Sequence, residues 1–185
     1  MKVAALIPAR KGSKRIKNKN RLLIDGIPML DILLKNLYSS DLFDEIFLST
    51  DDEFLAAKYR DNITILNRPK DLFDDYSTFI DVIKYHKKVE LLKFDIIFLI
   101  LPHAINLKGD DFKSALKKFL DEEPLRLITI CKLPVPVEWT FKIKKNDLVP
   151  LFKGAEIIRS QDLDEAYFDA GQFYIYKSDW FTNKK

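Results

Sequence analysis

The sequence predicts an α/β fold: a mostly parallel sheet with helices on both of its faces. Apolar segments of strand length alternate with longer segments of helical periodicity through most of the chain. This alternation is typical of βαβ units with right-handed crossovers. Residues 45–50 have the character of a strand that is buried on both faces, as strands of parallel sheets are. Residues 2–7 form an apolar strand that ends at Pro8 and a basic turn, the arrangement by which such sheets bind anions.

The first half of the chain is expected to contain three strands and three helices. Apolar residues repeat with helical spacing from Met29 to Tyr38, and Pro28 suits the first turn of that helix. Residues 51–53 are acidic and suit a helix start, because acidic side chains complement the helix dipole. Ser77 is expected to cap the third helix. The expected strands are 2–7, 45–50 and 63–66, and the expected helices are 29–38, 51–58 and 79–89.

The second half continues this alternation and then changes character. Pro102 ends the central strand, and an amphipathic helix and another strand follow it. From Lys132 onward, three prolines and the polar turn at residues 144–147 predict a hairpin that is inserted into the α/β core. The expected strands are 94–101, 127–131 and 172–176, and the expected helix is 110–120.

Length and composition fit a single soluble domain. The chain has 185 residues, of which 47% are hydrophobic and 32% are charged. Its net charge of +3 argues against a general nucleic-acid-binding protein, and no apolar run has membrane-spanning length. The N-terminal apolar stretch is too short for a signal peptide, so we expect a cytoplasmic protein without a membrane partner. Cys131, the only cysteine, is expected to be buried, and His86 is expected to be exposed.

The segment from Arg10 to Lys19 contains six Lys or Arg residues and no acidic residue. Directly after a buried strand, fixed positive charges and backbone N–H groups can converge on a polyanion. The segment is neither a Walker A motif nor a G-x-G-x-x-G motif, because Gly12 is its only glycine. A solvated basic turn and an RNA-binding or nuclear-localisation segment are the alternatives. An anionic small molecule is the partner that this pattern favours.

Three other polar segments are expected at the same edge of the sheet. They are residues 49–52, 67–69 and 102–103, each of which follows or ends a predicted strand. Ligands of parallel sheets bind outside the carboxyl ends of the strands. The sequence therefore predicts one nucleotide-sized site at this edge. His103 could contribute to it, although an ordinary loop histidine is the simpler interpretation.

Two motifs give the chain a family resemblance. Residues 7–20, I-P-A-R-K-G-S-K-R-I-K-N-K-N, resemble the opening motif of the acylneuraminate cytidylyltransferases, or CMP-sialic acid synthetases. Residues 159–174 are similar to a segment of the pseudaminic acid cytidylyltransferases. The resemblance implies a Rossmann-like nucleotidyltransferase sheet and the transfer of CMP from CTP to pseudaminic acid, an acidic nine-carbon sugar, with release of pyrophosphate. Legionaminic or N-acetylneuraminic acid as the acceptor, and an impaired nucleotide-binding homologue, are the alternatives.

The resemblance also implies roles for individual residues. Lys19 matches the lysine held closest to the α-phosphate, and it is implied to act with Arg10 in catalysis by stabilising negative charge. A capping role is the alternative for Arg68. A role as a helix N-cap is the alternative for Ser77. The positions that match nucleotide-binding residues of the family are Arg10, Ser13, Lys14, Lys19, Asn20, Arg68 and Ser77.

The acidic sugar is implied to contact Gln161, Asp169 and Gln172, because amide and carboxylate groups suit a hydroxyl-rich ligand. A structural turn at residues 169–171 is the alternative. Residues 133–168 resemble the dimerisation insert of the family, so we expect a homodimer built from one nucleotidyltransferase domain over residues 1–185.

Two departures from the family pattern concern the same site. The family uses Mg²⁺ held by an aspartate pair that lies beyond the last residue of this sequence, so the metal ligands are unknown and the C-terminal part of the family domain is expected to be absent. Residues 102–106 also lack the threonine and the second proline of the Pro-Thr-Ser/Ala-Pro segment of the family.

Overall fold

The computed structural model describes residues 1–14, 16–72, 77–88 and 90–181. The chain forms two units, which are described separately. Residues 1–128 and 172–185 make up the first unit, and residues 129–171 make up the second. None of the described helices is long and apolar enough to cross a membrane. The cytoplasmic location stays a prediction.

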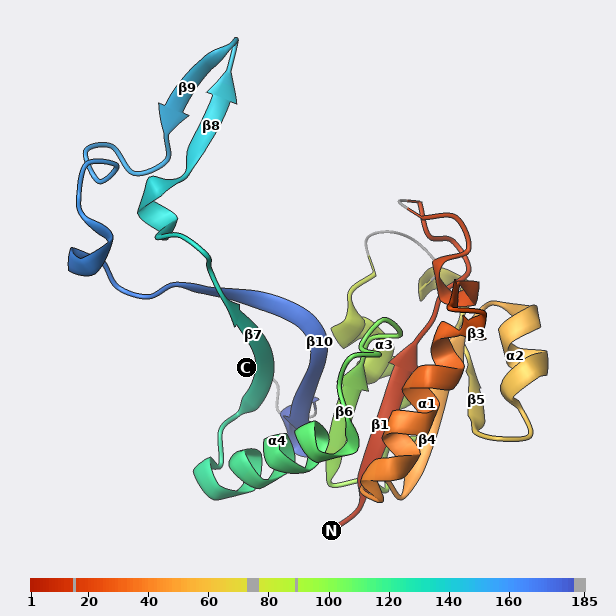
Figure 1. Cartoon of the computed structure of the whole chain (residues 1–185). Coiled ribbons are helices and arrows are strands. Elements are labelled where there is room, and N and C mark those ends of the chain that lie inside the picture. Colours follow the sequence, from red (N-terminus) through yellow and green to blue (C-terminus); the bar gives the residue numbers. More distant parts are fainter. Residues whose placement is uncertain (15, 73–76, 89, 182–185) are drawn as a thin grey trace. The chain divides into compact units, whose positions relative to one another are not determined.

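The main sheet has the strand order β5-β4-β1-β6-β10-β7 (Figure 1). Strands β5, β4, β1 and β6 are parallel neighbours, whereas β10 runs antiparallel to β6. The prediction of a mostly parallel sheet is therefore confirmed. The strand bounds are β1 Val3–Pro8, β4 Glu45–Thr50, β5 Thr64–Asn67, β6 Ile96–Ile100, β7 Arg126–Lys132 and β10 Tyr167–Lys177.

Helices cover both faces of this sheet (Figure 1). Alternate residues of β1 point to opposite faces, as the period of a strand requires. Val3, Ala5 and Ile7 pack with residues of helices α1, α2 and α4, whereas Ala4 and Leu6 pack with residues of α3. The helix bounds are α1 Met29–Ser40, α2 Glu53–Tyr59, α3 Phe79–His86 and α4 Gly109–Glu122.

Two small hairpins lie outside the main sheet. In the first unit, β2 (Leu23–Ile24) and β3 (Ile27–Pro28) are joined by a turn with positive φ at both of its residues. In the second unit, β8 (Phe141–Lys144) pairs with β9 (Asp147–Pro150). The hairpin predicted after Lys132 is therefore confirmed.

Three local predictions are wrong. Thr78, not Ser77, caps α3, because the Thr78 hydroxyl accepts from the Asp81 amide and the Asp81 carboxylate accepts from Thr78. Cys131 is exposed, because β7 is an edge strand without a buried residue. His86 is 1% exposed, because it lies on the face of α3 that packs against β4.

Candidate active site at the carboxyl edge of the sheet

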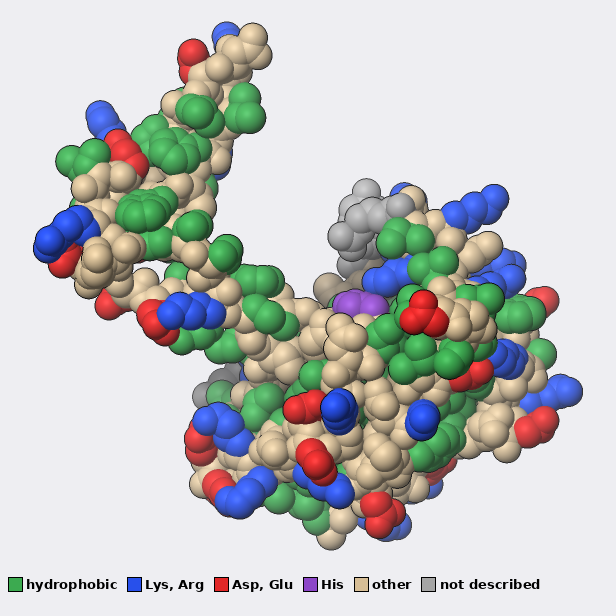
Figure 2. Space-filling model, in the orientation of Figure 1, with side chains coloured by type: hydrophobic (Ala, Val, Ile, Leu, Met, Phe, Trp, Pro, Cys, Tyr) green, Lys and Arg blue, Asp and Glu red, His purple; other side chains and the backbone are tan. Residues whose placement is uncertain are grey.

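A cleft of about 680 Å³ opens at the carboxyl ends of β1 and β6. It is lined by four cationic residues (Arg10, Lys14, Lys19 and Arg68) and, among its described residues, by no carboxylate. Lys and Arg side chains gather beside a histidine on the face shown in Figure 2. All the residues predicted to bind nucleotide line this cleft: Arg10, Ser13, Lys14, Lys19, Asn20, Arg68 and Ser77.

The basic segment is attached to the end of β4 by three hydrogen bonds. The Ala9 amide donates to the Ser49 carbonyl at 2.9 Å, and the Thr50 hydroxyl donates to the Ala9 carbonyl at 2.6 Å. The Lys11 amide donates to Oδ1 of Asp51 at 2.7 Å. These bonds fix the direction in which the chain leaves β1. The cations that follow are therefore held at the mouth of the cleft.

A short 3₁₀ turn, η1 (Lys19–Arg21), ends the basic segment. The chain enters it through Asn18, which has a left-handed backbone with φ of 53°. Nδ2 of Asn20 donates to the Arg10 carbonyl at 2.9 Å and so ties the end of the segment to its start. The side chain of Asn20 thus closes a loop that presents its cations to one cleft.

Arg21 anchors the same turn to helix α2. Its Nε donates to Oδ2 of Asp52 at 2.8 Å, and its Nη2 donates to Oδ1 at 2.6 Å. Oδ1 of Asp52 also caps α2 by accepting from the amides of Phe54 and Leu55. Burial raises the pKa of Asp52, but the bonds from Arg21 and from the two amides outweigh it, so the pKa lies below its ordinary value. A role for Arg21 is not predicted from the sequence. The acidic residues 51–53 at the expected helix start were the available signal, because they can pair with a cation.

Lys19 contacts a residue from the opposite side of the cleft. Its Nζ lies 3.2 Å from Nδ1 of His103, in the loop after β6. Both side chains are half-buried. His103 therefore lines the cleft, and whether it has a role beyond that of a loop histidine stays a prediction.

Arg68 is an unusual member of this group because its guanidinium is buried. The residue is 8% exposed, and its Nε and Nη2 have no hydrogen-bond partner among the described residues. Burial lowers the pKa of Arg68; Asp51 opposes this effect and Arg10 adds to it. Buried donors of this kind are costly unless a ligand supplies acceptors. The phosphates of a nucleotide could supply such acceptors, and the nucleotide-binding role of Arg68 stays a prediction.

His86 lies deeper in the same region. Its Nε2 is 3.0 Å from the Ser49 hydroxyl, and its Nδ1 is 3.7 Å from the Glu90 carboxylate. Burial lowers the pKa of His86, and the nearby Arg68 charge lowers it further, against the effect of Glu90. A neutral imidazole thus lies at the end of β4 and adds no charge to the cations of the cleft.

Comparison with known proteins agrees with this geometry. A sequence model of the family described as cytidylyltransferase matches residues 4–110, which is more than half of the chain. A pseudaminic acid cytidylyltransferase of Campylobacter jejuni subsp. jejuni serotype O:2 is 34% identical over 184 residues, which cover 95% of this chain and 78% of the relative. The chain belongs to the cytidylyltransferase family.

Two further cytidylyltransferase-related proteins are similar to the whole chain. An N-acylneuraminate cytidylyltransferase of Streptococcus agalactiae serotype III is 25% identical over 193 residues, which cover 100% of this chain and 46% of the relative. A solved structure of a CMP:2-keto-3-deoxy-manno-octonic acid synthetase complexed with CTP has a TM-score of 0.72 and 19% identity, over 99% of this chain and 77% of that one. The second likeness shows that the fold is shared.

The residues predicted to bind sugar are divided between the two units of this cytidylyltransferase. Gln172 lies in the first unit, where its carbonyl accepts from the amide of Leu101, a residue that lines the cleft. Gln161 and Asp169 lie in the second unit. Oδ1 of Asp169 accepts from the Gly171 amide at 2.8 Å, as the structural-turn alternative expects. Contact of these three residues with a sugar stays a prediction.

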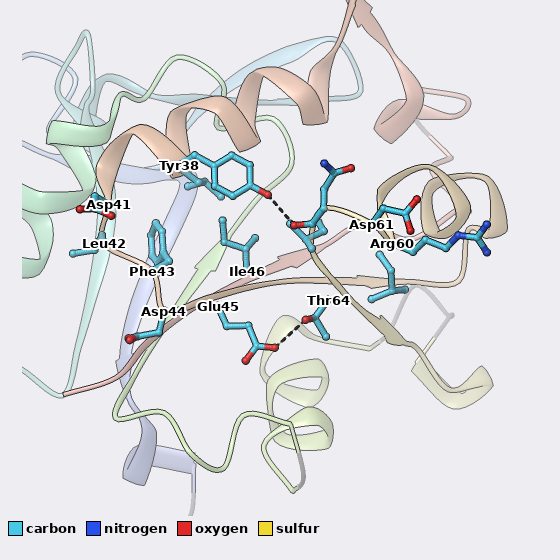
Figure 3. Close-up of a pocket in the computed structure, with 14 residues that line it drawn as sticks. Tyr38, Asp41, Leu42, Phe43, Asp44, Glu45, Ile46, Arg60, Asp61 and Thr64 are labelled. Atoms are coloured by element: carbon cyan, nitrogen blue, oxygen red, sulfur yellow. Dashed lines mark hydrogen bonds between the residues drawn. The ribbon is translucent and has the colours of Figure 1, made fainter.

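A second hollow, of about 570 Å³, lies near the amino ends of β4 and β5 (Figure 3). Two of its hydroxyl groups make structural contacts: that of Tyr38 donates to the Asn62 carbonyl at 3.0 Å, and that of Thr64 donates to Glu45 at 2.9 Å. It contains none of the predicted site residues. The cationic cleft is therefore the candidate active site of this cytidylyltransferase.

Proposed function

We propose that this chain transfers CMP from CTP to pseudaminic acid and releases pyrophosphate. The observation that carries the proposal is the cleft in which every predicted nucleotide-binding residue comes together. The choice of sugar is supported by the 34% identity to a pseudaminic acid enzyme, compared with 25% to an N-acylneuraminate enzyme. The similarity of residues 159–174 to pseudaminic acid enzymes supports the same choice.

In the proposed reaction, the cleft positions the triphosphate and neutralises charge. Arg10 and Lys14 hold the phosphates, and Ser13 offers them a hydroxyl donor. The anomeric oxygen of the sugar forms a bond to the α-phosphorus, the bond from that phosphorus to the bridging oxygen of the β-phosphate breaks, and the hydroxyl proton passes to solvent. Negative charge builds on the leaving pyrophosphate, and the Lys19 ammonium stabilises it.

A magnesium ion is expected from the family but does not fit the cleft as it is described. The described lining residues supply no carboxylate, and the described residues contain no group of three or more His, Cys, Asp or Glu that could hold a metal. The dependence on Mg²⁺ stays a prediction, which pyrophosphate release with and without a chelator tests.

We also propose that the second unit holds together a homodimer. None of its residues, 129–171, is buried within the chain. Several are large apolar side chains with high exposure, including Ile143 at 78%, Leu148 at 70% and Ile157 at 84%. A unit without a buried residue gains little from burial to offset the entropy of its own ordering. A second copy of the chain is the partner that the resemblance of residues 133–168 to a dimerisation insert favours.

The proposed function is tested by measuring pyrophosphate release from CTP with each of three sugars. Pseudaminic acid is expected to support the highest kcat/KM, and legionaminic and N-acetylneuraminic acids lower values. A higher value with another sugar would overturn the substrate, but not the reaction. If no sugar releases pyrophosphate while CTP still raises the melting temperature, the chain is a nucleotide-binding homologue and the proposed reaction is wrong.

A further inference from the structure

The contact between Lys19 and His103 joins two sides of the candidate active site. Lys19 belongs to η1, at the end of the basic segment, and His103 belongs to the loop between β6 and α4. Nζ of Lys19 and Nδ1 of His103 are 3.2 Å apart, within hydrogen-bonding distance. The two residues are separated by 84 positions in the sequence, so only the fold brings them together.

The chemistry of this pair fixes the direction of the hydrogen bond. A lysine ammonium has three donors and no acceptor, so Nδ1 of His103 has to accept. An imidazole that accepts at Nδ1 is neutral and carries its hydrogen on Nε2. A neutral partner orients the ammonium without cancelling its charge. A carboxylate at the same place would cancel that charge and would repel a triphosphate.

The backbone on both sides of His103 is held in place. The Leu101 amide donates to the Gln172 carbonyl of β10, and the Ala104 amide closes a turn onto the Leu101 carbonyl, both at 2.9 Å. Ala104 is fully buried in the core. Two residues after His103, the Ile105 carbonyl accepts from Nδ2 of Asn36 on α1 at 3.0 Å. His103 is thus presented by a loop that is fastened to the sheet and to a helix.

Lys19, by contrast, extends from a short turn on a flexible four-carbon side chain. An acceptor on a fixed loop restricts the positions that its ammonium can take, and such restriction is how an active site keeps a charge where the transition state needs it. The resemblance to the family does not imply a role for His103, because residues 102–106 differ from the family pattern at this residue.

We propose that His103 is a positioning residue for the transfer reaction: through Nδ1 it accepts a hydrogen bond from Lys19 and fixes the ammonium in the cleft. This role depends on the proposed function, because it concerns the step in which pyrophosphate leaves. It assigns to the loop after β6 a part in catalysis, in addition to a part in shaping the cleft.

Kinetics of the full chain test the role. His103→Ala is expected to lower kcat about tenfold or more, since a hydrogen bond to a charged group is lost, and to change the KM for CTP less than threefold. His103→Asn keeps an acceptor near the position of Nδ1 and is expected to recover kcat to within about threefold of the unsubstituted chain. Equal losses in the two variants, or an unchanged kcat in His103→Ala, would overturn the proposal.

A double-mutant cycle separates positioning from a structural role. In a chain that already carries Lys19→Ala, His103→Ala is expected to cause almost no further loss of kcat, because its partner is gone. In a chain that carries Arg68→Met instead, the two losses of kcat are expected to multiply. Full multiplication of the two losses in the Lys19 cycle would contradict the proposed role.

The tautomer of His103 tests the contact without any activity. The chain contains two histidines, so ¹⁵N imidazole spectra of the unsubstituted chain and of His103→Asn assign both rings. We expect the neutral Nε2–H tautomer for His103 and a shift of its Nδ1 resonance in Lys19→Met. An Nδ1–H tautomer would overturn the contact. If no sugar supports turnover but the spectra show the expected tautomer and shift, the proposed function is wrong although the hydrogen bond is present.

Discussion

Lys19 brings a positive charge into a cleft that already contains Arg10, Lys14 and Arg68. Without a ligand, like charges that line one cleft repel one another, and an anion with several charges relieves that repulsion. The hydrogen bond from Asn20 to the Arg10 carbonyl closes the loop that carries Arg10, Lys14 and Lys19. At the scale of single residues, the site is therefore organised around charge and needs no nucleophile of its own.

Replacing Lys19 with alanine is expected to lower kcat by about 100-fold or more, since removing one preorganised charge stabiliser costs roughly 3 kcal/mol of barrier. The KM for CTP is expected to change less, because the other cations still hold the phosphates. Pyrophosphate release at saturating sugar measures both constants. The control is Lys17→Ala, an exposed lysine of the same segment that is not among the described lining residues. Equal losses in the two variants would contradict the role of Lys19.

Replacing Arg68 with methionine is expected to stabilise the ligand-free protein and to weaken CTP binding. The substitution removes two buried donors that have no partner among the described residues, and the burial of such donors costs about 1–3 kcal/mol. The melting temperature without ligand is expected to rise, and the further rise that CTP causes is expected to shrink. Arg60→Met, at an exposed arginine, is the control and should leave the CTP effect intact. An undiminished CTP effect in Arg68→Met would show that Arg68 does not bind the nucleotide.

The nucleotide side of the site could be predicted from the sequence because its residues follow the ends of recognisable strands. Lys19 and Arg68, which follow β1 and β5, line the one cleft that the sequence predicts. Contacts between distant segments could not be predicted in this way. The Arg21–Asp52 pair, the Lys19–His103 contact and the burial of His86 depend on how α2, α3 and the loop after β6 pack, which no local pattern reports.

Helix α2 serves the site through its first turn. Asp52 caps the helix and also holds Arg21, so the start of α2 and the end of the basic segment share one carboxylate. Arg21 also lies over the Phe54 ring, 4.7 Å from its centroid. Replacing this carboxylate is therefore expected to affect both the start of α2 and the position of Lys19, which lies two residues before Arg21.

The charge of Asp52 is expected to make stability depend on pH. Its pKa in the folded protein is below the ordinary value of 3.8, so the unfolded chain takes up a proton first as the pH falls. The stabilisation by Asp52 is thus present at neutral pH and is lost as the pH falls through and below that value. Asp52→Asn keeps a capping oxygen but not the charge. It is expected to lower the free energy of unfolding by about 1 kcal/mol at pH 7 and by less near pH 3.

Urea unfolding at several pH values measures this difference. The control is Asp110→Asn, at the start of α4, whose carboxylate is 96% exposed and should contribute nothing measurable. A deficit of Asp52→Asn that stays constant from pH 7 to pH 3 would mean that the lost charge is not its cause.

Most strands and helices could be predicted to within a few residues. Pro or Asp at the ends of the apolar segments marks where a strand can begin or end. Strand β4, for example, spans Glu45–Thr50 as predicted. The direction and length of β10 were harder to predict. Its first part, from Tyr167, has no buried residue, and its pairing with β6 joins segments more than 70 residues apart.

The whole molecule divides its tasks between two units of different character. The first contains the core and the cationic cleft, whereas the second has no buried residue. The exposed apolar side chains of the second unit are the surface that the proposed dimer would bury.

Substituting Ile143 and Leu148 together with aspartate is expected to convert a dimer into a monomer. The two residues are paired across the β8–β9 hairpin, so both charges fall on one apolar surface. Sedimentation equilibrium measures the assembly, and urea unfolding reports whether the first unit stays intact. The control places aspartate at Lys142 and Lys144 of the same strand, where no apolar area is lost. A double variant that remains dimeric, or an unsubstituted chain that is monomeric, would rule out this interface.

Strands β7 and β10 are neighbours in the main sheet, and the chain leaves for residues 129–171 through one of them and returns through the other. The two ends of this excursion are thus separated by about one strand spacing, roughly 5 Å, which a tight turn can span. In evolutionary terms, we expect such a unit to be lengthened or exchanged without a change in the basic segment. It contains Gln161 and Asp169, which are predicted to contact the sugar, and the exposed apolar side chains of the proposed dimer interface. One exchange is therefore expected to alter both the proposed assembly and the choice of acceptor.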